Sequence, residues 1–198
     1  QITRLITMGT PHFGASLALF RLRGMDKSVG LSGPDIKRLA NAPGYSSAFE
    51  LVPPKQTALT TERASPGNLP SVMDPFDTRI AKRLNMNGQN ITLARDFWSV
   101  LDLTKRPDHI EYFFIVGSSL KTNIRNEWIN ASQDPLPILQ KSAGDGTVSI
   151  ASACVAGIPH VFSQKKHSTI FTDRKVREYL YQFLDAPANV HPQSVDHV

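Results

Sequence analysis

Residues 110–117 read Ile-Glu-Tyr-Phe-Phe-Ile-Val-Gly, a near-continuous apolar run that is closed by a glycine. Runs of this kind are typical of strands that are buried on both faces of a parallel sheet. Residues 3–9, Thr-Arg-Leu-Ile-Thr-Met-Gly, are a second short run that ends at a turn signal, and they predict another buried strand. We expect residues 5–8 and 112–116 to be neighbouring or near-neighbouring parallel strands of one sheet.

Between these two runs the sequence predicts mostly helices and loops. Apolar spacing favours short helical pieces near 35–42 and 45–51, and two amphipathic helices over 77–102 that are separated near Asn87-Gly88. Residues 17–75 are rich in Gly, Pro and Ser and are only weakly periodic. A long segment of that composition inside a compact domain is usually a lid or a binding loop, so we expect it to be a mobile cover.

After the central run, we expect residues 118–141 to be a polar connection, 147–155 a short helix and 159–163 a short strand. Residues 173–184 predict a closing helix that is capped by Asp173. The whole order predicts an α/β fold with a parallel sheet, whose functional loops lie at the carboxyl ends of the strands. We expect one domain over 1–184, with a lid or cap insertion over about 17–105, and a tail or linker over 185–198.

Composition excludes several classes of protein. The chain of 198 residues, 40% hydrophobic and 20% charged, has the balance of an ordinary folded domain, and its apolar runs are too short to span a membrane. Its single cysteine, Cys154, excludes an internal disulfide and a cysteine-rich metal site. The formal net charge of +5 comes from scattered basic residues. This favours a solvated face first and association with an anionic membrane surface second, and we expect no nucleic-acid partner.

The pattern Gly144-Asp145-Gly146-Thr147-Val148 predicts a tight loop that presents one carboxylate, because glycines flank the acid on both sides. His167 follows 22 residues later, after a predicted strand and just before the last helix. At that place, a hydrogen bond between Asp145 and one ring nitrogen could orient the imidazole, and the other nitrogen could act as a general base. An ordinary Asp-Gly turn and a surface histidine are the alternatives, and His160 is a competing base within a predicted strand.

A third informative stretch, Gly9-Thr10-Pro11-His12-Phe13-Gly14-Ala15, follows the first strand. Loops at that position often line a binding site, so His12 and Phe13 are candidates for binding substrate in an acyl pocket. The alternative is a rigid turn with a packed aromatic side chain.

These motifs together resemble the serine α/β-hydrolases of the lipase and esterase group. Residues 5–14 resemble the segment after the nucleophile elbow, 144–148 the catalytic-acid loop, and 166–168 with the following helix the histidine loop. Residues 46–54, Ser-Ser-Ala-Phe-Glu-Leu-Val-Pro-Pro, are similar to a segment of the lecithin:cholesterol acyltransferase-like lipases. The resemblance implies the C-terminal part of an α/β-hydrolase fold with a lid, and a Ser-His-Asp triad to which Asp145 and His167 contribute.

The Gly-x-Ser-x-Gly elbow of these enzymes should precede the first strand, and residues 1–198 contain no good match. We therefore expect the nucleophile, and the oxyanion hole with it, on an N-terminal hydrolase fragment outside this chain. Ser16 and Ser46 lie in loosened versions of the motif and are weaker candidates. The expected reaction is hydrolysis of a lipid or other acyl ester, without a metal or a cofactor. The alternatives are acyl transfer by the same triad, a non-catalytic hydrolase-like scaffold, and a basic surface-binding module.

Overall fold

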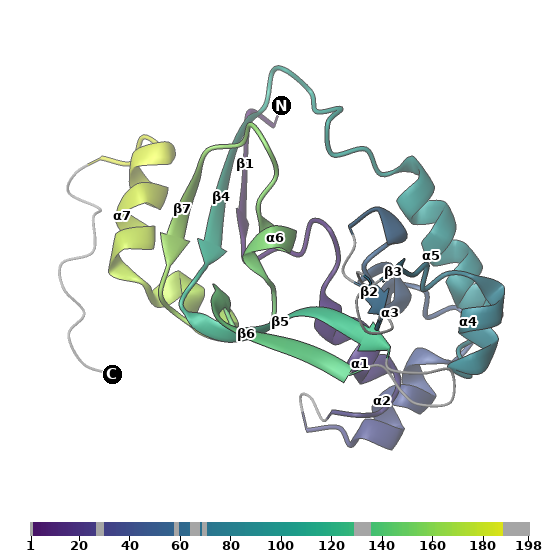
Figure 1. Ribbon diagram of the computed structural model, residues 1–198. Helices are drawn as coiled ribbons and strands as arrows, with labels where there is room; N and C mark the ends of the chain where they lie inside the picture. Colours follow the sequence, from purple (N-terminus) through teal and green to yellow (C-terminus); the bar gives the residue numbers. More distant parts are fainter. Residues whose placement is uncertain are drawn as a thin grey trace.

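The computed structural model describes residues 2–26, 30–57, 60–63, 68, 71–128 and 136–187. Two sheets and several helices make up this part of the chain (Figure 1). In chain order the elements are β1 (Arg4–Met8), α1 (Ser16–Leu22), α2 (Gly33–Ala40), α3 (Ser47–Glu50), η1 (Lys55–Thr57), β2 (Thr60–Glu62), β3 (Ser71–Val72), α4 (Thr78–Arg83), α5 (Gly88–Val100), β4 (Glu111–Gly117), β5 (Leu120–Trp128), β6 (Leu136–Gly144), α6 (Ile150–Ala153), β7 (His160–Ser163), η2 (His167–Thr172) and α7 (Arg174–Phe183), where η1 and η2 are 3-10 helices.

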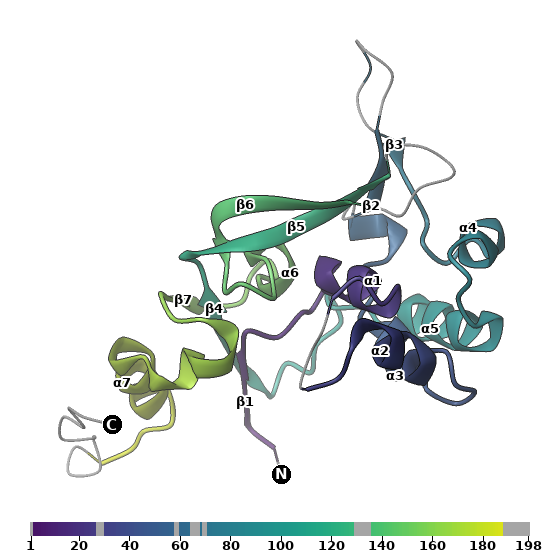
Figure 2. The same cartoon turned by 90° about the horizontal axis from the view of Figure 1, so that it is seen from below.

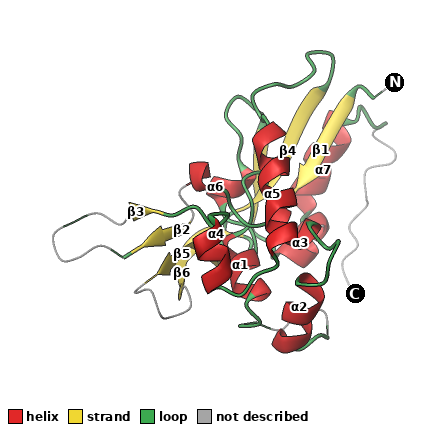
Figure 3. Ribbon diagram, turned by 90° about the vertical axis from the view of Figure 1, so that its right-hand side faces the viewer, coloured by secondary structure: helices red, strands yellow, loops and turns green. Residues whose placement is uncertain are grey.

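The first sheet has the strand order β1-β4-β7, and all three strands are parallel. Leu5 pairs with Tyr112 and Met8 with Ile115, so the two sequence runs are adjacent strands as predicted. The two faces of β4 are both buried, which explains its continuous apolar character. Phe114 and Val116 pack into a cluster with residues of the α6 region, while Ile115 packs on the other face with Val176 of α7. Figure 3 shows α6 and α7 on opposite sides of this sheet.

Capping residues set the starts of several helices. Asn87 caps α5 by accepting a hydrogen bond from the backbone N–H of Asn90, and Asp77 does the same for α4 through Arg79. The predicted pair of helices over 77–102 is thereby confirmed, with the break at Asn87. Asp173 caps α7 as predicted, since its side chain accepts from the N–H of Lys175. The short helices near 35–42 and 45–51, the helix within 147–155 and the strand within 159–163 are also present, as α2, α3, α6 and β7.

The prediction of a polar connection over 118–141 is wrong. Most of that segment forms the long antiparallel strands β5 and β6, which belong to a second sheet of order β3-β2-β5-β6. Its strand pattern is hidden because buried positions carry polar residues: Thr122, Asn123 and Asn126 are all buried in β5. These side chains find hydrogen-bond partners instead of apolar neighbours, as in the bond from Asn123 Nδ2 to Asn126 Oδ1. The pair β5–β6, called the ribbon below, extends from the first sheet toward α1 (Figures 1 and 2).

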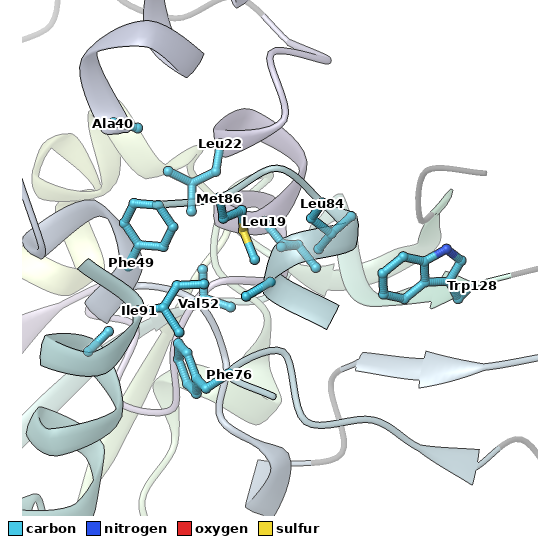
Figure 4. Packing of buried hydrophobic residues seen from close by; sticks show 12 residues of the cluster. Leu19, Leu22, Ala40, Phe49, Val52, Phe76, Leu84, Met86, Ile91 and Trp128 are labelled. Carbon is cyan, nitrogen blue, oxygen red and sulfur yellow. The ribbon is translucent and has the colours of Figure 1, made fainter. Parts of the chain in front are cut away.

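The segment between β1 and β4 has more internal packing than its composition predicts. Helices α1 to α5 gather around an apolar cluster, which we call the helical core (Figure 4). Leu19, Phe49 and Ile91 are among its almost fully buried members, and Trp128 joins it from the end of β5. The guanidinium of Arg83 lies 4.8 Å from the ring centroid of Trp128. The expectation that little holds residues 17–75 in place is therefore wrong for their described part, and the mobility expected for a lid stays a prediction.

Two further expectations concern the C-terminal tail and the absence of a membrane-spanning segment. Of the expected tail over 185–198, only residues 185–187 are described, and Asp185 there pairs with Arg4 of β1. The rest of that tail lies outside the described residues. Among the helices of the described part, none is both long and apolar enough to cross a bilayer.

Candidate active site

The carboxyl ends of β1, β4 and β7 meet at one edge of the first sheet, because the three strands are parallel. Gly9 follows the end of β1, and Gly117 is the last residue of β4. Strand β6 of the second sheet ends at Gly144, and the next residue, Asp145, lies at this edge beside Gly117. His167 lies four residues beyond the end of β7, at the start of η2. Two loops that are distant in sequence therefore deliver a carboxylate and an imidazole to the same place.

Asp145 and His167 are in direct contact. Oδ2 of Asp145 lies 2.8 Å from Nδ1 of His167, and the backbone N–H of His167 donates to the carbonyl of Asp145 at 2.9 Å. Asp145 is 1% exposed, whereas the His167 side chain is 41% exposed. The contact that the sequence predicts between these residues is present. With a proton on Nδ1, the imidazole donates to the carboxylate and leaves Nε2 as a proton acceptor.

The second carboxylate oxygen of Asp145 is held by its own loop. Oδ1 accepts hydrogen bonds from the backbone N–H groups of Thr147, at 2.9 Å, and Val148, at 2.7 Å. Because these two donors occupy Oδ1, the other oxygen is aimed at His167. The local sequence Asp-Gly-Thr-Val therefore builds an acid whose orientation is fixed on both sides, as a base-orienting carboxylate requires.

Two glycines make room for the pair. A Cβ on Gly9, which has a φ of +58°, would lie 2.8 Å from Oδ2 of Asp145 and 3.0 Å from Nδ1 of His167. A Cβ on Gly117 would lie 2.2 Å from Cβ of Asp145. The distances of 2.8 and 2.2 Å to Asp145 are shorter than a side-chain carbon tolerates, so the ends of β1 and β4 accept the acid loop because they carry no side chain.

Thr122 supports the acid loop from β5. Its hydroxyl accepts a hydrogen bond from the N–H of Gly146 at 2.9 Å and donates to the carbonyl of Leu120 at 3.1 Å. The residue is fully buried. Sequence reasoning missed Thr122 because the segment around it was taken as a polar connection. A buried threonine in a strand gives no sequence signal that distinguishes it from an exposed one.

A cavity of about 930 Å³ opens in front of the pair. Asp145, His167, Lys166 and Ser168 line it on the side of the first sheet. The opposite wall is formed by apolar side chains of the segment α1 to α3: Leu17, Ala18, Leu22, Ile36, Ala40 and Ala48. Figure 2 shows η2 on one side of the end of β1 and helices α1 and α2 on the other. The cavity thus has a polar side that carries the Asp145–His167 pair and an apolar side.

The structure does not bring His12 and Phe13 into this cavity. His12 stacks on Phe114, with ring centroids 4.3 Å apart, and its Nε2 lies 3.1 Å from the Thr7 hydroxyl. Burial lowers the pKa of His12 below its ordinary value, because it disfavours the charged ring. Phe13 packs on the α6 side and lines a separate cavity of about 860 Å³ beside Trp98. The alternative interpretation, a turn with packed aromatic rings, describes both residues.

The competing residues also lie elsewhere. His160 is on β7, with Nδ1 3.1 Å from the carbonyl of Ile158, and the described lining of the cavity does not include it. Ser16 is buried at the start of α1, where its neighbours Ala15 and Leu17 line the cavity but Ser16 does not. The Ser46 hydroxyl donates to Glu50 at 2.9 Å. Within the described residues, no hydroxyl forms a hydrogen bond with Nε2 of His167.

Across the described ranges, no group of three or more His, Cys, Asp and Glu side chains is arranged to hold a metal ion. Burial raises the pKa of the Cys154 thiol, which favours the unreactive protonated form.

Comparison of the sequence with protein-family models and with curated proteins found no match in either case.

Proposed function

We propose that this chain is the acid-and-base part of a serine α/β-hydrolase that cleaves acyl esters. The observation that carries the proposal is the 2.8 Å contact between Asp145 and His167 at the edge of a largely apolar cavity. A buried carboxylate that orients a half-exposed imidazole is the arrangement that general-base activation of a hydroxyl requires. The apolar wall opposite the pair suits the acyl part of an ester.

The reaction follows from this arrangement. Nε2 of His167 takes the proton of a serine hydroxyl while the serine oxygen attacks the ester carbonyl. His167 then gives that proton to the leaving alcohol as the carbon–oxygen bond of the ester breaks, and an acyl-serine remains. Water attacks the acyl-serine with the same histidine as base, which releases the acid and restores the serine. Throughout, Asp145 keeps the proton on Nδ1 and stabilises the positive charge of the ring.

The arrangement of the chain supports the α/β-hydrolase assignment. The acid precedes the histidine in sequence, as in the Ser…Asp…His order of these enzymes, and both lie at the carboxyl edge of parallel strands. The insertion between β1 and β4 forms the apolar wall of the cavity, which is the position of a cap. The same arrangement is compatible with acyl transfer, in which an alcohol replaces water in the second step.

We further propose that the serine comes from a segment outside residues 1–198. Ser16 and Ser46 do not line the cavity. Among the described strands, β1 pairs only with β4, so its other edge is open. A strand added there in parallel would end at the same edge as Gly9 and would bring its following loop beside His167. That segment would also supply the oxyanion hole.

A fluorophosphonate probe, which reacts with activated serines, tests this proposal. Residues 1–198 alone should stay unlabelled and should not hydrolyse short acyl esters above background. The protein that includes the upstream segment should be labelled on that segment and should be active. His167→Ala should remove labelling and lower turnover by several orders of magnitude, about 10⁴-fold or more. His160→Ala is the matched control and should keep both.

Two results would reject the hydrolase assignment or its base, and one would reject the external serine. Near-normal turnover by His167→Ala would show that another group is the base. Labelling of Ser16 or Ser46 would show that the nucleophile is internal to this chain. A longer protein that neither reacts with the probe nor hydrolyses esters would favour a non-catalytic scaffold.

A further inference from the structure

A second cavity, of about 860 Å³, lies on the α6 side of the first sheet. It opens between α6, η1 and the end of α5, and its described lining shares no residue with the cavity in front of Asp145 and His167. Pockets that hold small molecules commonly have volumes of about 300–1,000 Å³ and lie where two structural units meet. This cavity has that size and lies where the first sheet meets the helical segment.

Much of the lining of the second cavity is apolar. Phe13, Leu103 and Val155 line it from the cluster that packs on Phe114 of β4. Trp98 of α5 lines it from the other side, where its ring also packs against the helical core. Phe13 therefore lines a cavity, although it is not the cavity of the Asp145–His167 pair.

Arg106 adds a cation to this apolar lining, and the residue is half-buried. Its Nη1 donates to the carbonyl of Leu103 at 2.5 Å, and its guanidinium carbon lies 5.9 Å from the centre of the Tyr112 ring. Within the described residues, Nε and Nη2 have no hydrogen-bond partner and the guanidinium has no carboxylate beside it. A half-buried charge without an anionic partner is costly in free energy, and a carboxylate that meets two of its N–H groups offsets that cost.

Asp102, the acid in the described lining, is already engaged. Its Oδ1 accepts hydrogen bonds from the N–H and the hydroxyl of Thr104, at 3.0 and 2.6 Å. Its Oδ2 lies 3.4 Å from Nζ of Lys105. The charge of Asp102 is thus matched by Lys105, and the charge of Arg106 is left for a ligand.

We propose that this cavity binds a small apolar carboxylate. The carboxylate accepts hydrogen bonds from Nε and Nη2 of Arg106, and the hydrocarbon part lies against Phe13 and Trp98. A peptide fits less well, because its backbone would bring polar groups onto apolar side chains that offer them no partner. The acids that ester hydrolysis releases belong to this class of ligand, but binding needs neither the serine nor the Asp145–His167 pair.

Titration of the chain with octanoate, followed by NMR, tests the site. The chain has two tryptophans, so its indole N–H region holds two signals, which Trp98→Phe assigns. Octanoate should shift the Trp98 signal until it saturates and leave in place that of Trp128, which is buried in the helical core. Octanol, the uncharged analogue, should bind about tenfold or more weakly, since it cannot form a charge-assisted pair.

Three variants separate charge recognition from shape. Arg106→Gln should raise the Kd of octanoate about tenfold or more and leave that of octanol unchanged. Arg174→Gln is the matched control, because this side chain is 79% exposed and lies outside the described lining, and it should bind like the wild type. Ala151→Leu should weaken binding of both ligands, since the larger side chain fills part of the cavity, and it tests the site even if Arg106→Gln unfolds.

His167→Ala should bind octanoate normally, so a failure of the hydrolase proposal does not affect this result. The inference is wrong if octanoate leaves the Trp98 signal in place, or if it moves only signals of residues that line the Asp145–His167 cavity. Equal affinity for octanol and octanoate that Arg106→Gln does not change would reject the carboxylate as the recognised group.

Discussion

His167 and Asp145 are joined at two points, once through the ring and carboxylate at 2.8 Å and once through the backbone N–H of His167 and the Asp145 carbonyl at 2.9 Å. The backbone bond fixes the start of η2 on the acid loop independently of the side chains. A substitution of the carboxylate can therefore change the proton on the ring without moving the loop. This separation makes the chemical role of Asp145 testable apart from its structural role.

Asp145→Asn should preserve the fold and remove the orienting acceptor, because the amide has nearly the same shape and can donate to Nδ1. We expect turnover in the protein that carries the serine to fall about 10⁴-fold. In the isolated chain, the imidazole N–H proton of His167 should lose its strongly hydrogen-bonded NMR signal while the rest of the spectrum stays dispersed. Asp108→Asn, an exposed control, should leave both readouts unchanged. A retained signal in Asp145→Asn would contradict the role of the carboxylate.

Gly117→Ala should displace the acid loop. The new Cβ would meet the Asp145 Cβ at 2.2 Å and its Cα at 2.9 Å, so the loop or the strand must shift. Overpacking of this kind costs about 1–3 kcal/mol of unfolding free energy, and it should disturb the Asp145–His167 contact as well. Gly88→Ala is the control, because no atom lies within 4 Å of its added carbon, and it should change stability by less than about 1 kcal/mol. Urea unfolding measures both, and equal effects of the two variants would refute the steric argument.

Thr122 should act as a positioning residue for the acid loop. Thr122→Val keeps the shape of the side chain and removes the acceptor for the Gly146 N–H, so we expect a loss of about 1 kcal/mol in stability. It should also lower kcat more than it raises KM, since the acid is misaligned while the apolar wall is intact. Thr122→Ser keeps the hydroxyl and should restore kcat. If serine and valine behaved alike, packing of the γ-methyl and not the hydrogen bond would explain the residue.

The attachment of α7 should depend on pH. Burial opposes ionisation of Asp173, but hydrogen bonds from the Ser163 hydroxyl and from the N–H groups of Gln164 and Lys175 outweigh it and hold the pKa of the carboxyl below its ordinary value. A group whose folded-state pKa is depressed adds stability that is complete above its unfolded pKa and is lost as pH falls through the folded pKa. The free energy of unfolding should therefore decrease below about pH 4.

Asp173→Asn should flatten that decrease, because the variant has no proton to bind at this position. Ser163→Ala removes the shortest of the three hydrogen bonds, at 2.7 Å, and should give an intermediate slope. Urea unfolding at a series of pH values supplies the comparison. A wild-type slope that persists in Asp173→Asn would assign the acid sensitivity to another carboxyl.

The parts of the fold that the sequence predicts correctly are those in which burial and local pattern agree. β4 is apolar because both of its faces are covered, and α7 begins where Asp173 caps it, so each could be placed from its own residues. The acid and the histidine could also be paired, since glycines flank one and a strand precedes the other. The ribbon could not, because its buried positions carry polar residues: Asn123 donates to Asn126 within β5, and Asn126 donates to the distant carbonyl of Ser16.

Loop direction accounts for the remaining errors. His12 and Phe13 follow β1 at the correct edge of the sheet, but the chain turns at Gly9 and Gly14, both with positive φ, and sends the two rings toward Phe114 and the α6 side. Their sequence position was compatible with either direction. The segment between β1 and β4 could not be predicted for a similar reason, since the helical core combines residues of α1 to α5 with Trp128, 109 positions after Leu19. Weak local periodicity did not reveal contacts at that separation.

One strand, β5, contacts both the helical segment between β1 and β4 and the acid loop. At its far end Trp128 is embedded in the helical core, and Asn126 donates to the carbonyl of Ser16 in α1 at 2.7 Å. Near its start the hydroxyl of Thr122 accepts a hydrogen bond from the N–H of Gly146, next to Asp145. The apolar wall of the cavity and the carboxylate across from it are therefore attached to one element, so a substitution within β5 can change both.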